Sequence, residues 1–346
     1  MGFFKQQNVK NITIGENVRY LNNSFANLFK ECSNFDRQVN IPRGITNATN
    51  AFANCYNLIS TVFIPNTVQN TYMMFSYCTK LNTPPIIEDG IENLYGMLRY
   101  CNSFNTTVNI PQSVTNLHSF FDMCRNYNSL VNFPNNVTHI TRMFSGCSAF
   151  NQKLSIPDSV THMSYCFQDC QNYNQPTTLP SNAIGLNYVF SGCYKFNQQI
   201  TIPESTKYVI GMFNGCNLFN RTVVFPNNVE QATNVFRNCH NFNSQVNFGT
   251  NITRLDNAFS NCGNFGNKIF IHSPNVTDTY RMLYGKNSSK RIDIYIPKNA
   301  SNEMRNAMLT NNMASIIGSA IGYSNNSSNG CIGYNASKNI YIYNTI

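Results

Sequence analysis

The chain has 346 residues, a length that fits either two domains or one extended architecture. Hydrophobic residues make up 42% of it and aromatic residues 13%, which is enough to bury a core and excludes a fully disordered chain. The formal charge of +9, from 24 basic and 15 acidic residues, is mild at this length and does not indicate nucleic-acid binding. No apolar run reaches the ~18 residues of a transmembrane helix, so membrane insertion is not expected.

Residues 1–31 are predicted to form an N-terminal cap and the first coil of a repeat. The stretch from Ile14 to Cys32 is four residues longer than the same stretch of later coils, such as Ile41 to Cys55, as expected of a capping unit. The first seven residues, Met1 to Gln7, lack the apolar stretch of about 7–15 residues that marks a signal peptide. We therefore expect either a cytoplasmic chain or one that leaves the cell by a route such as lysis.

Residues 32–285 are predicted to form a solenoid of 23-residue repeats, and from Cys32 to Cys262 the cysteines recur every 23 residues without an insertion. We number each coil from its cysteine as position 0. An aromatic residue or leucine stands at positions −3 and +3, and a proline usually stands at +10. Such a regular period predicts a repeat fold. The repeated cysteines are Cys32, Cys55, Cys78, Cys101, Cys124, Cys147, Cys170, Cys193, Cys216, Cys239 and Cys262.

One unit indicates how each coil folds. Leu154 and Ile156 alternate with polar residues and predict a short strand with one buried face, which Pro157 ends. Between Val160 and Cys170 the apolar residues recur at steps of three and four, which predicts a bend and a short helical or 3₁₀ turn. Stacked coils would pair these strands in parallel in one long sheet. The predicted fold class is a β-rich α/β solenoid of about 11 coils with a distinct C-terminal cap.

Residues 286–322 are predicted to form that cap, because the 23-residue step is lost after Cys262. Ile292 to Pro297 alternates like a last strand. Ser301 to Leu309 is predicted to be a short helix with Asn299 or Ser301 as its N-cap.

Residues 323–346 are predicted to be a Ser/Asn/Gly-rich linker followed by a terminal strand from Asn339 to Ile346. The strand could add to an open sheet edge in a partner or in a second copy, which would give a homo-oligomer. It could equally cap the sheet of its own chain. Both readings stay open at the level of the sequence.

The cysteine column could form disulfides, because neighbouring coils bring Cα atoms to ~5 Å. Parallel stacking points the Cβ atoms side by side, however, and eleven is an odd number, which favours reduced, buried thiols. The sequence contains no Cys-x-x-Cys pair, and we expect no metal site, no cofactor and no catalytic residues. His139 and His162 lie one period apart and could bind metal or sense pH. Asparagine occupies their column elsewhere, which favours a tolerated polar position.

Three further positions of the coil, +4, −1 and +1, carry polar or aromatic side chains. At position +4, asparagine recurs and is predicted to be buried and to pair with backbone groups at the turns. Tyr56, Tyr77 and Tyr100 are predicted to point outward and are the candidate binding residues, suited to sugars or to an apolar patch on a partner. Scattered surface tyrosines are the alternative. The +4 asparagines are Asn82, Asn105, Asn128, Asn151, Asn174, Asn197, Asn220 and Asn243.

The unit from Val160 to Gln175 follows the pattern Val-Thr-x-Met-x-x-x-Phe-x-x-Cys-x-x-Phe-Asn-Gln, with a tyrosine at one aromatic position. This pattern resembles the BspA-type leucine-rich repeats and is similar to the related Met-Phe/Phe-Asn-Gln repeats of bacterial surface proteins. The resemblance covers roughly residues 9–312. It implies a leucine-rich-repeat-like solenoid used for adhesion or recognition, without catalysis.

The leading functional prediction is a non-enzymatic recognition or structural protein located in a bacteriophage virion, acting in host adsorption or as a fibre or decoration protein. The alternatives are a bacterial or protozoan cell-surface adhesin and a cytoplasmic interaction scaffold. The expected partners are other virion or surface proteins and a host-surface protein or glycan. Nucleic acid is not an expected partner.

Overall fold

The computed structural model describes residues 21–301, 304–305, 308, 321–322, 331–335 and 339–344. The chain divides into two compact units, residues 1–173 (unit 1) and residues 174–346 (unit 2). Each unit is a β-solenoid built from 23-residue coils. Most of the predicted N-terminal cap, residues 1–20, lies outside the described residues.

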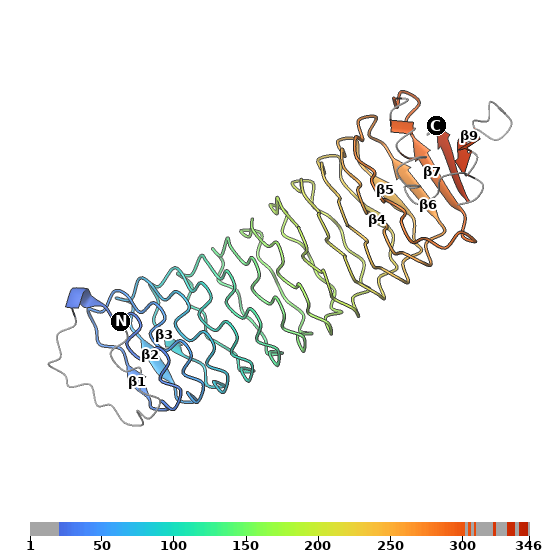
Figure 1. The fold of residues 1–346 in the computed structure, drawn as a ribbon. Coiled ribbons are helices and arrows are strands. Elements are labelled where there is room, and N and C mark those ends of the chain that lie inside the picture. Colours follow the sequence, from blue (N-terminus) through green and yellow to red (C-terminus); the bar gives the residue numbers. More distant parts are fainter. Residues whose placement is uncertain are drawn as a thin grey trace. The chain divides into compact units, whose positions relative to one another are not determined.

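Unit 1 begins with the 3₁₀ turn η1 (Leu21–Asn23) and contains the strands β1 (Val39–Asn40), β2 (Val62–Ile64) and β3 (Ile86–Ile87). These strands pair in parallel in the order β1-β2-β3 (Figure 1). Val39 pairs with Val62, and Phe63 pairs with Ile86, so each strand is displaced by one 23-residue coil. The inward side chains of this sheet are aliphatic because one strand face packs against the core.

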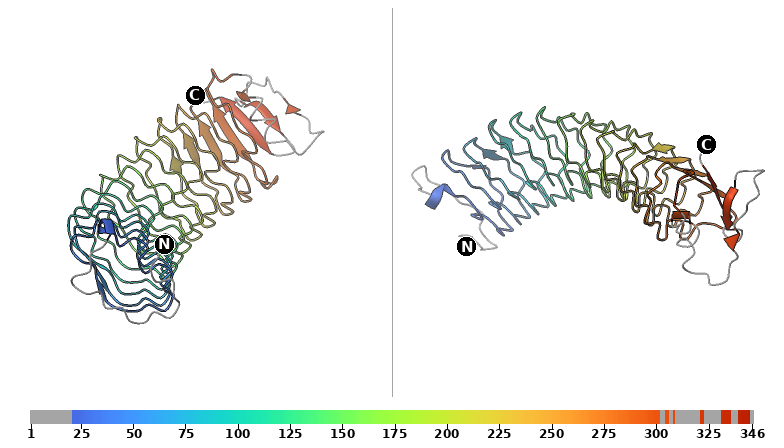
Figure 2. Two further views of the ribbon diagram at one scale, coloured as in Figure 1. Left: turned by 60° about the vertical axis from the view of Figure 1, so that its left-hand side comes forward. Right: turned by 90° about the horizontal axis from the view of Figure 1, so that it is seen from above.

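Unit 2 contains a seven-stranded sheet in the order β4-β5-β6-β7-β10-β9-β8, seen near the C-terminus in both views of Figure 2. The first four strands are parallel, and each belongs to the next coil. The last three strands come from the C-terminal segment: β10 is parallel to β7, whereas β9 is antiparallel to β10 and to β8. The strands are β4 (Val223–Val224), β5 (Val246–Phe248), β6 (Lys268–Ile271), β7 (Ile292–Ile296), β8 (Ile321–Gly322), β9 (Cys331–Asn335) and β10 (Ile340–Asn344).

The prediction of one long sheet is wrong, because many coils contain no ladder strand. Residues 151–157, where a strand was expected, form none, although Leu154 is buried as predicted. The Asn151 backbone N–H there donates to the side-chain oxygen of Asn128 (2.8 Å) instead of to a neighbouring strand. Successive coils are joined instead by single parallel bridges at position −8, such as that between Asn116 and His139.

The stretch expected to form a short helix or 3₁₀ turn forms consecutive tight turns instead, so helix content is minimal. Around Cys147, backbone N–H groups donate three residues back, from Met143 to Ile140 (3.1 Å) and from Cys147 to Phe144 (2.9 Å). Arg142 and Gly146 have positive φ angles of 57° and 72° at the third residue of these turns, as a type II turn requires. The intervening N–H groups donate to the next coil, as from Gly146 to Gln168 (2.7 Å). The turn residues therefore bind the coils together.

The C-terminal segment agrees with the sequence in three details. The strand predicted over Ile292 to Pro297 is β7, and the predicted terminal strand is β10. Ser301 caps a helical turn, because its Oγ accepts the Met304 N–H (3.1 Å). Residues 304, 305 and 308 are helical, and the rest of the predicted helix lies outside the described residues. Within unit 2, β10 extends the sheet of its own chain.

The eleven repeated cysteines are buried and free, as predicted. Nine of these thiols also donate a hydrogen bond to the carbonyl oxygen at position −3 of the preceding coil, so they do more than fill space in the core. Cys55 Sγ lies 3.0 Å from the Phe29 carbonyl oxygen, and Cys147 Sγ lies 3.1 Å from that of Phe121. Burial raises the pKa of the thiols, to about 11 for Cys32 and to about 12 for Cys262. The thiols therefore stay protonated and serve as hydrogen-bond donors inside the core.

This burial predicts a sharp difference in thiol reactivity. In the native protein at about pH 8, iodoacetamide should label the half-exposed Cys331 well before it labels Cys147, because only thiolates react and the Cys147 thiol is buried and protonated. After denaturation without a reductant, all thirteen cysteines should be labelled. Peptide mass spectrometry measures both results. Recovery of cross-linked cysteine peptides would contradict the structure.

The asparagines at position +4 have the predicted structural role, but they are not buried. The Asn105 side-chain oxygen accepts the Asn128 N–H (2.8 Å), and the Asn220 side-chain oxygen accepts the Asn243 N–H (2.8 Å). All eight side chains are half-exposed or exposed. They therefore satisfy backbone donors along the surface of each unit.

Candidate functional site

Aromatic side chains gather on the surface of unit 1 at two positions of the coil, −6 and −1. Both positions belong to the tight turns that precede the cysteine. The side chains at −4, −3 and 0 fill the core, so those at −6 and −1 are left outside it. Because the coils repeat, residues at one position stack on each other in neighbouring coils. A column of aromatic residues therefore becomes a row of touching rings.

The first row is formed by Tyr72, Tyr95 and His118 at position −6. The Tyr95 and His118 rings stack with centroids 4.3 Å apart, and the Tyr72 and Tyr95 centroids lie 5.0 Å apart. Tyr72 is 40% exposed at the end of the row.

The second row is formed by Tyr77 and Tyr100 at position −1, whose rings stack at 4.3 Å with planes only 6° apart. The guanidinium of Arg99 lies 5.0 Å from the Tyr100 centroid, and Arg99 Nε donates to Asp122 (2.7 Å). The Asp122 side chain is almost fully buried, so the carboxylate holds the guanidinium in place. We call Tyr72, Tyr77, Tyr95, Tyr100, His118 and Arg99 the aromatic face.

The charges around the aromatic face favour a neutral histidine beside fixed cations. Burial lowers the pKa of His118, and the charges of Arg142, His139 and Arg99 lower it further. Burial raises the pKa of Asp122, but the Arg99 guanidinium opposes that shift and is paired with the carboxylate. The face therefore presents ring edges, phenol hydroxyls and a held arginine, which suits binding rather than bond chemistry.

The structure brings two of the three predicted binding residues together. Tyr77 and Tyr100 stack in the aromatic face, whereas Tyr56 lies at position +1 and is 45% exposed. Among the described residues, Tyr56 makes no ring contact with the other two. The sequence reasoning missed Tyr72, Tyr95 and His118, although their own 23-residue spacing could have identified them.

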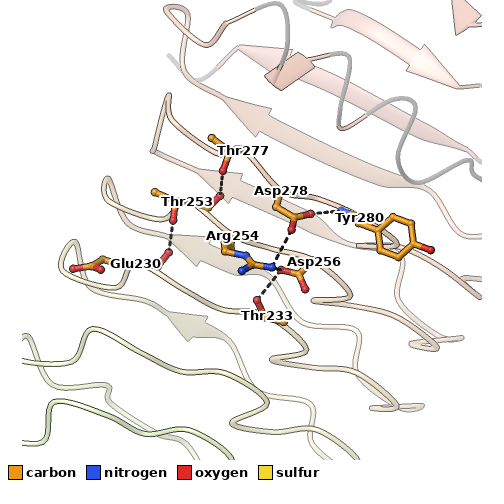
Figure 3. Close-up of polar contacts among 8 residues, drawn as sticks. All are labelled: Glu230, Thr233, Thr253, Arg254, Asp256, Thr277, Asp278 and Tyr280. Atoms are coloured by element: carbon orange, nitrogen blue, oxygen red, sulfur yellow. Dashed lines mark hydrogen bonds and ion pairs between the residues drawn. The ribbon is translucent and has the colours of Figure 1, made fainter.

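The corresponding surface of unit 2 carries a salt-bridge network in place of aromatic rows (Figure 3). Arg254 Nη2 lies 3.3 Å from Asp256 Oδ1 and 3.1 Å from Asp278 Oδ2. Thr233 donates to Asp256 (2.7 Å), and the Tyr280 backbone N–H donates to Asp278 (3.0 Å). These groups bind one another across neighbouring coils, so the role of the network is to stabilise the stacking of the coils.

His139 and His162 stack at 4.3 Å, and the ring Nδ1 of each is bonded to the hydroxyl of the preceding threonine at 2.8 Å. Burial and the neighbouring His162 lower the pKa of His139. In the part of the chain that the structure describes, no group of three or more His, Cys, Asp or Glu side chains could hold a metal ion.

Among the described residues, no helix is long and apolar enough to cross a membrane.

Two family models match the sequence. The model described as "BspA type Leucine rich repeat region (6 copies)" matches residues 1–128 and 210–328, more than half of the chain. The model described as "Mycoplasma protein of unknown function, DUF285" matches residues 92–203 and 156–248. No curated protein shows significant similarity to the chain.

Solved structures of similar proteins come from several bacteria. A leucine-rich repeat protein from Bacteroides ovatus is 16% identical, with 78% of this chain and 89% of that chain covered and a TM-score of 0.49. A leucine-rich cell surface protein from Faecalibacterium prausnitzii is 20% identical, with 82% and 78% covered and a TM-score of 0.47. The pneumococcal vaccine antigen PcpA is 16% identical, with 82% and 70% covered and a TM-score of 0.48.

Proposed function

Because the chain belongs to the family of proteins with a BspA-type leucine-rich repeat region, we propose that it is a non-enzymatic binding protein that acts in adhesion at a cell surface. Proteins of this family usually lie at the cell surface, and neither matching family model indicates an enzyme. The strongly repeated residues all have packing or hydrogen-bonding roles in the coils, which leaves the outward columns for recognition.

The aromatic face is the observation that supports this function best. Its rings are held by stacking on neighbouring coils, and Arg99 is held by the buried Asp122, so the surface loses little conformational freedom when a partner binds. Tyrosine and arginine are also the side chains enriched where binding energy is concentrated in protein interfaces. The aromatic face therefore fits a rigid contact surface for a partner.

A bacteriophage virion role, expected from the sequence, receives no support from the comparisons, whose family models and solved structures are bacterial. The cell-surface adhesin, which was the alternative, is the function we propose. No observation favours the cytoplasmic scaffold.

The proposal predicts that loss of the second ring row abolishes most adhesion. Beads coated with the Tyr77→Ala/Tyr100→Ala variant should adhere to cultured epithelial cells about 10-fold less than beads with the original protein, because anchor tyrosines each contribute strongly. Fluorescence counting of bound beads measures the effect.

The control is Tyr194→Ala, which removes an exposed tyrosine (45%, against 41% for Tyr77) outside the aromatic face and should leave adhesion unchanged. Tyr56→Ala tests whether the binding surface extends to position +1. Equal adhesion by the double variant, or an equal loss in the Tyr194 control, would refute the proposal. Far-ultraviolet circular dichroism of each variant verifies that the coils remain folded.

A further inference from the structure

A third row of aromatic rings lies on the outer face of the C-terminal sheet in unit 2. Phe270, Tyr295 and Tyr343 occupy paired positions on the parallel strands β6, β7 and β10. The Phe270 and Tyr295 centroids lie 4.5 Å apart, and those of Tyr295 and Tyr343 lie 5.1 Å apart. All three side chains are half-exposed, because the intervening isoleucines take the inward positions. We call this row the C-terminal ladder.

Basic side chains collect beside the C-terminal ladder, at the start of β6 and β7. Lys268, Lys290 and Arg291 are exposed there, and Lys286 Nζ donates to the Lys290 carbonyl (2.7 Å). The acidic Asp293 lies on the same face, and Arg291 Nε already holds its carboxylate at 2.8 Å. Among the described residues, Lys268 and Lys290 have no carboxylate within ion-pair distance. In a chain with only 11% charged residues, this is a marked local excess of positive charge.

Arg291 connects the basic side chains to the aromatic rings. Its guanidinium lies 4.3 Å from the Tyr341 centroid, and its Nη2 donates to the Tyr343 hydroxyl oxygen (2.6 Å). Because that oxygen accepts, the hydroxyl hydrogen of Tyr343 stays available to donate to an outside acceptor. Burial raises the pKa of Tyr343, so the hydroxyl keeps that hydrogen. Lys268 Nζ lies 6.0 Å from the Tyr295 centroid at the other side of the row.

We propose that the C-terminal ladder, with Lys268, Lys290 and Arg291, is a binding site for an acidic polysaccharide. The lysines and Arg291 would pair with its carboxylate or sulfate groups, and Tyr343 would donate to the same oxygens. Asp293 and the phenol oxygen of Tyr295 would accept hydrogen bonds from sugar hydroxyls. This site lies in unit 2, so it goes beyond the proposed function and does not depend on the aromatic face.

Other polyanions fit the same surface less well. Nucleic-acid bases bind by stacking on exposed ring faces, but the ladder rings stack on one another at 4.5 and 5.1 Å and leave no gap for a base. An anionic membrane needs an apolar surface to insert, whereas the ladder presents ring edges and hydroxyls. An acidic peptide adding as a strand needs an open backbone edge, but β7 is paired on both sides.

Surface plasmon resonance with the full chain tests the site on immobilised hyaluronate, heparin, neutral dextran, oligo(dT) and phosphatidylserine vesicles. We expect binding to hyaluronate or heparin that weakens with added salt, and none to dextran. The Lys268→Gln/Lys290→Gln variant should raise the dissociation constant about 10-fold or more, since each lost charge-assisted contact is substantial. Tyr343→Phe, which removes only the hydroxyl, should weaken binding by a smaller factor.

The matched control is Lys153→Gln/Lys195→Gln, which removes two exposed lysines elsewhere and keeps the same net charge as the test variant. It should bind like the original protein. An equal loss in this control would show non-specific charge attraction and overturn the site. The proposal also fails if neither acidic polysaccharide binds, or if oligo(dT) or the vesicles bind more tightly. None of these results changes the expected behaviour of the Tyr77→Ala/Tyr100→Ala variant.

Discussion

Replacing Phe144 by alanine is expected to lower the free energy of unfolding by ~3–5 kcal/mol. The Phe144 ring is fully buried and lies 4.4 Å from the Phe150 ring in its own coil. It also stacks on Phe121 (5.9 Å) and Phe167 (5.8 Å) in the two neighbouring coils. Removal leaves a cavity that touches three coils and that hydrogen-bonded turns cannot close. Urea unfolding followed by circular dichroism measures the change.

Lys153→Ala in the adjoining outward position is the control, and it should cost under ~0.5 kcal/mol because the side chain is exposed. Equal effects of the two substitutions would show that the inward and outward faces of this coil are assigned incorrectly.

A large loss of stability is also expected from Gly249→Ala, at about 1–3 kcal/mol, because the added methyl group has no room between this coil and the preceding one. A Cβ atom at this position would lie 2.5 Å from the Pro226 carbonyl oxygen and 2.6 Å from Asn227 Cα. Both are backbone atoms of the preceding coil, so no side-chain rotation can relieve the clash. The two coils would have to separate. Thermal unfolding of the variant measures the cost.

Gly263→Ala provides the control for this prediction. A Cβ at position 263 meets no atom within 4 Å, so the substitution should change stability by less than about 0.5 kcal/mol. If both glycine variants unfold at the same temperature as the original protein, the close approach of the coils at Gly249 is not present in solution.

The 23-residue period predicted the coils well because it depends on contacts between neighbours at a constant spacing. A side chain such as Phe144 must lie inside when every coil repeats it, and the buried thiol of Cys147 follows from the same rule. The turns were predicted less well, because apolar steps of three and four suit a helix and a series of turns equally. Glycine and asparagine at positions −5 and −1, as at Gly96 and Asn54, were the signal for positive φ.

The C-terminal pairing could not be predicted from periodicity, since β10 and β7 are far apart in the sequence and share no repeat. Alternation in Ile340 to Tyr343 predicts a strand, but it does not identify the partner. The candidate site was predicted in part for a similar reason. Tyr77 and Tyr100 were identified as neighbouring tyrosines, whereas the row at position −6 includes a histidine and was not recognised as a stacked surface.

The buried thiols determine how such a protein would age outside a cell. Twelve cysteines are buried, and oxidants attack the thiolate form of exposed cysteines. In a folded coil the sulfur is both hidden and protonated, and its hydrogen is engaged by a backbone carbonyl, as for Cys147. Oxidation of these twelve thiols must therefore wait for a coil to open, and its rate follows the frequency of local unfolding more than the concentration of oxidant, whereas the half-exposed Cys331 can react in the folded protein. The least stable coil thus determines when the first of the buried thiols is oxidised.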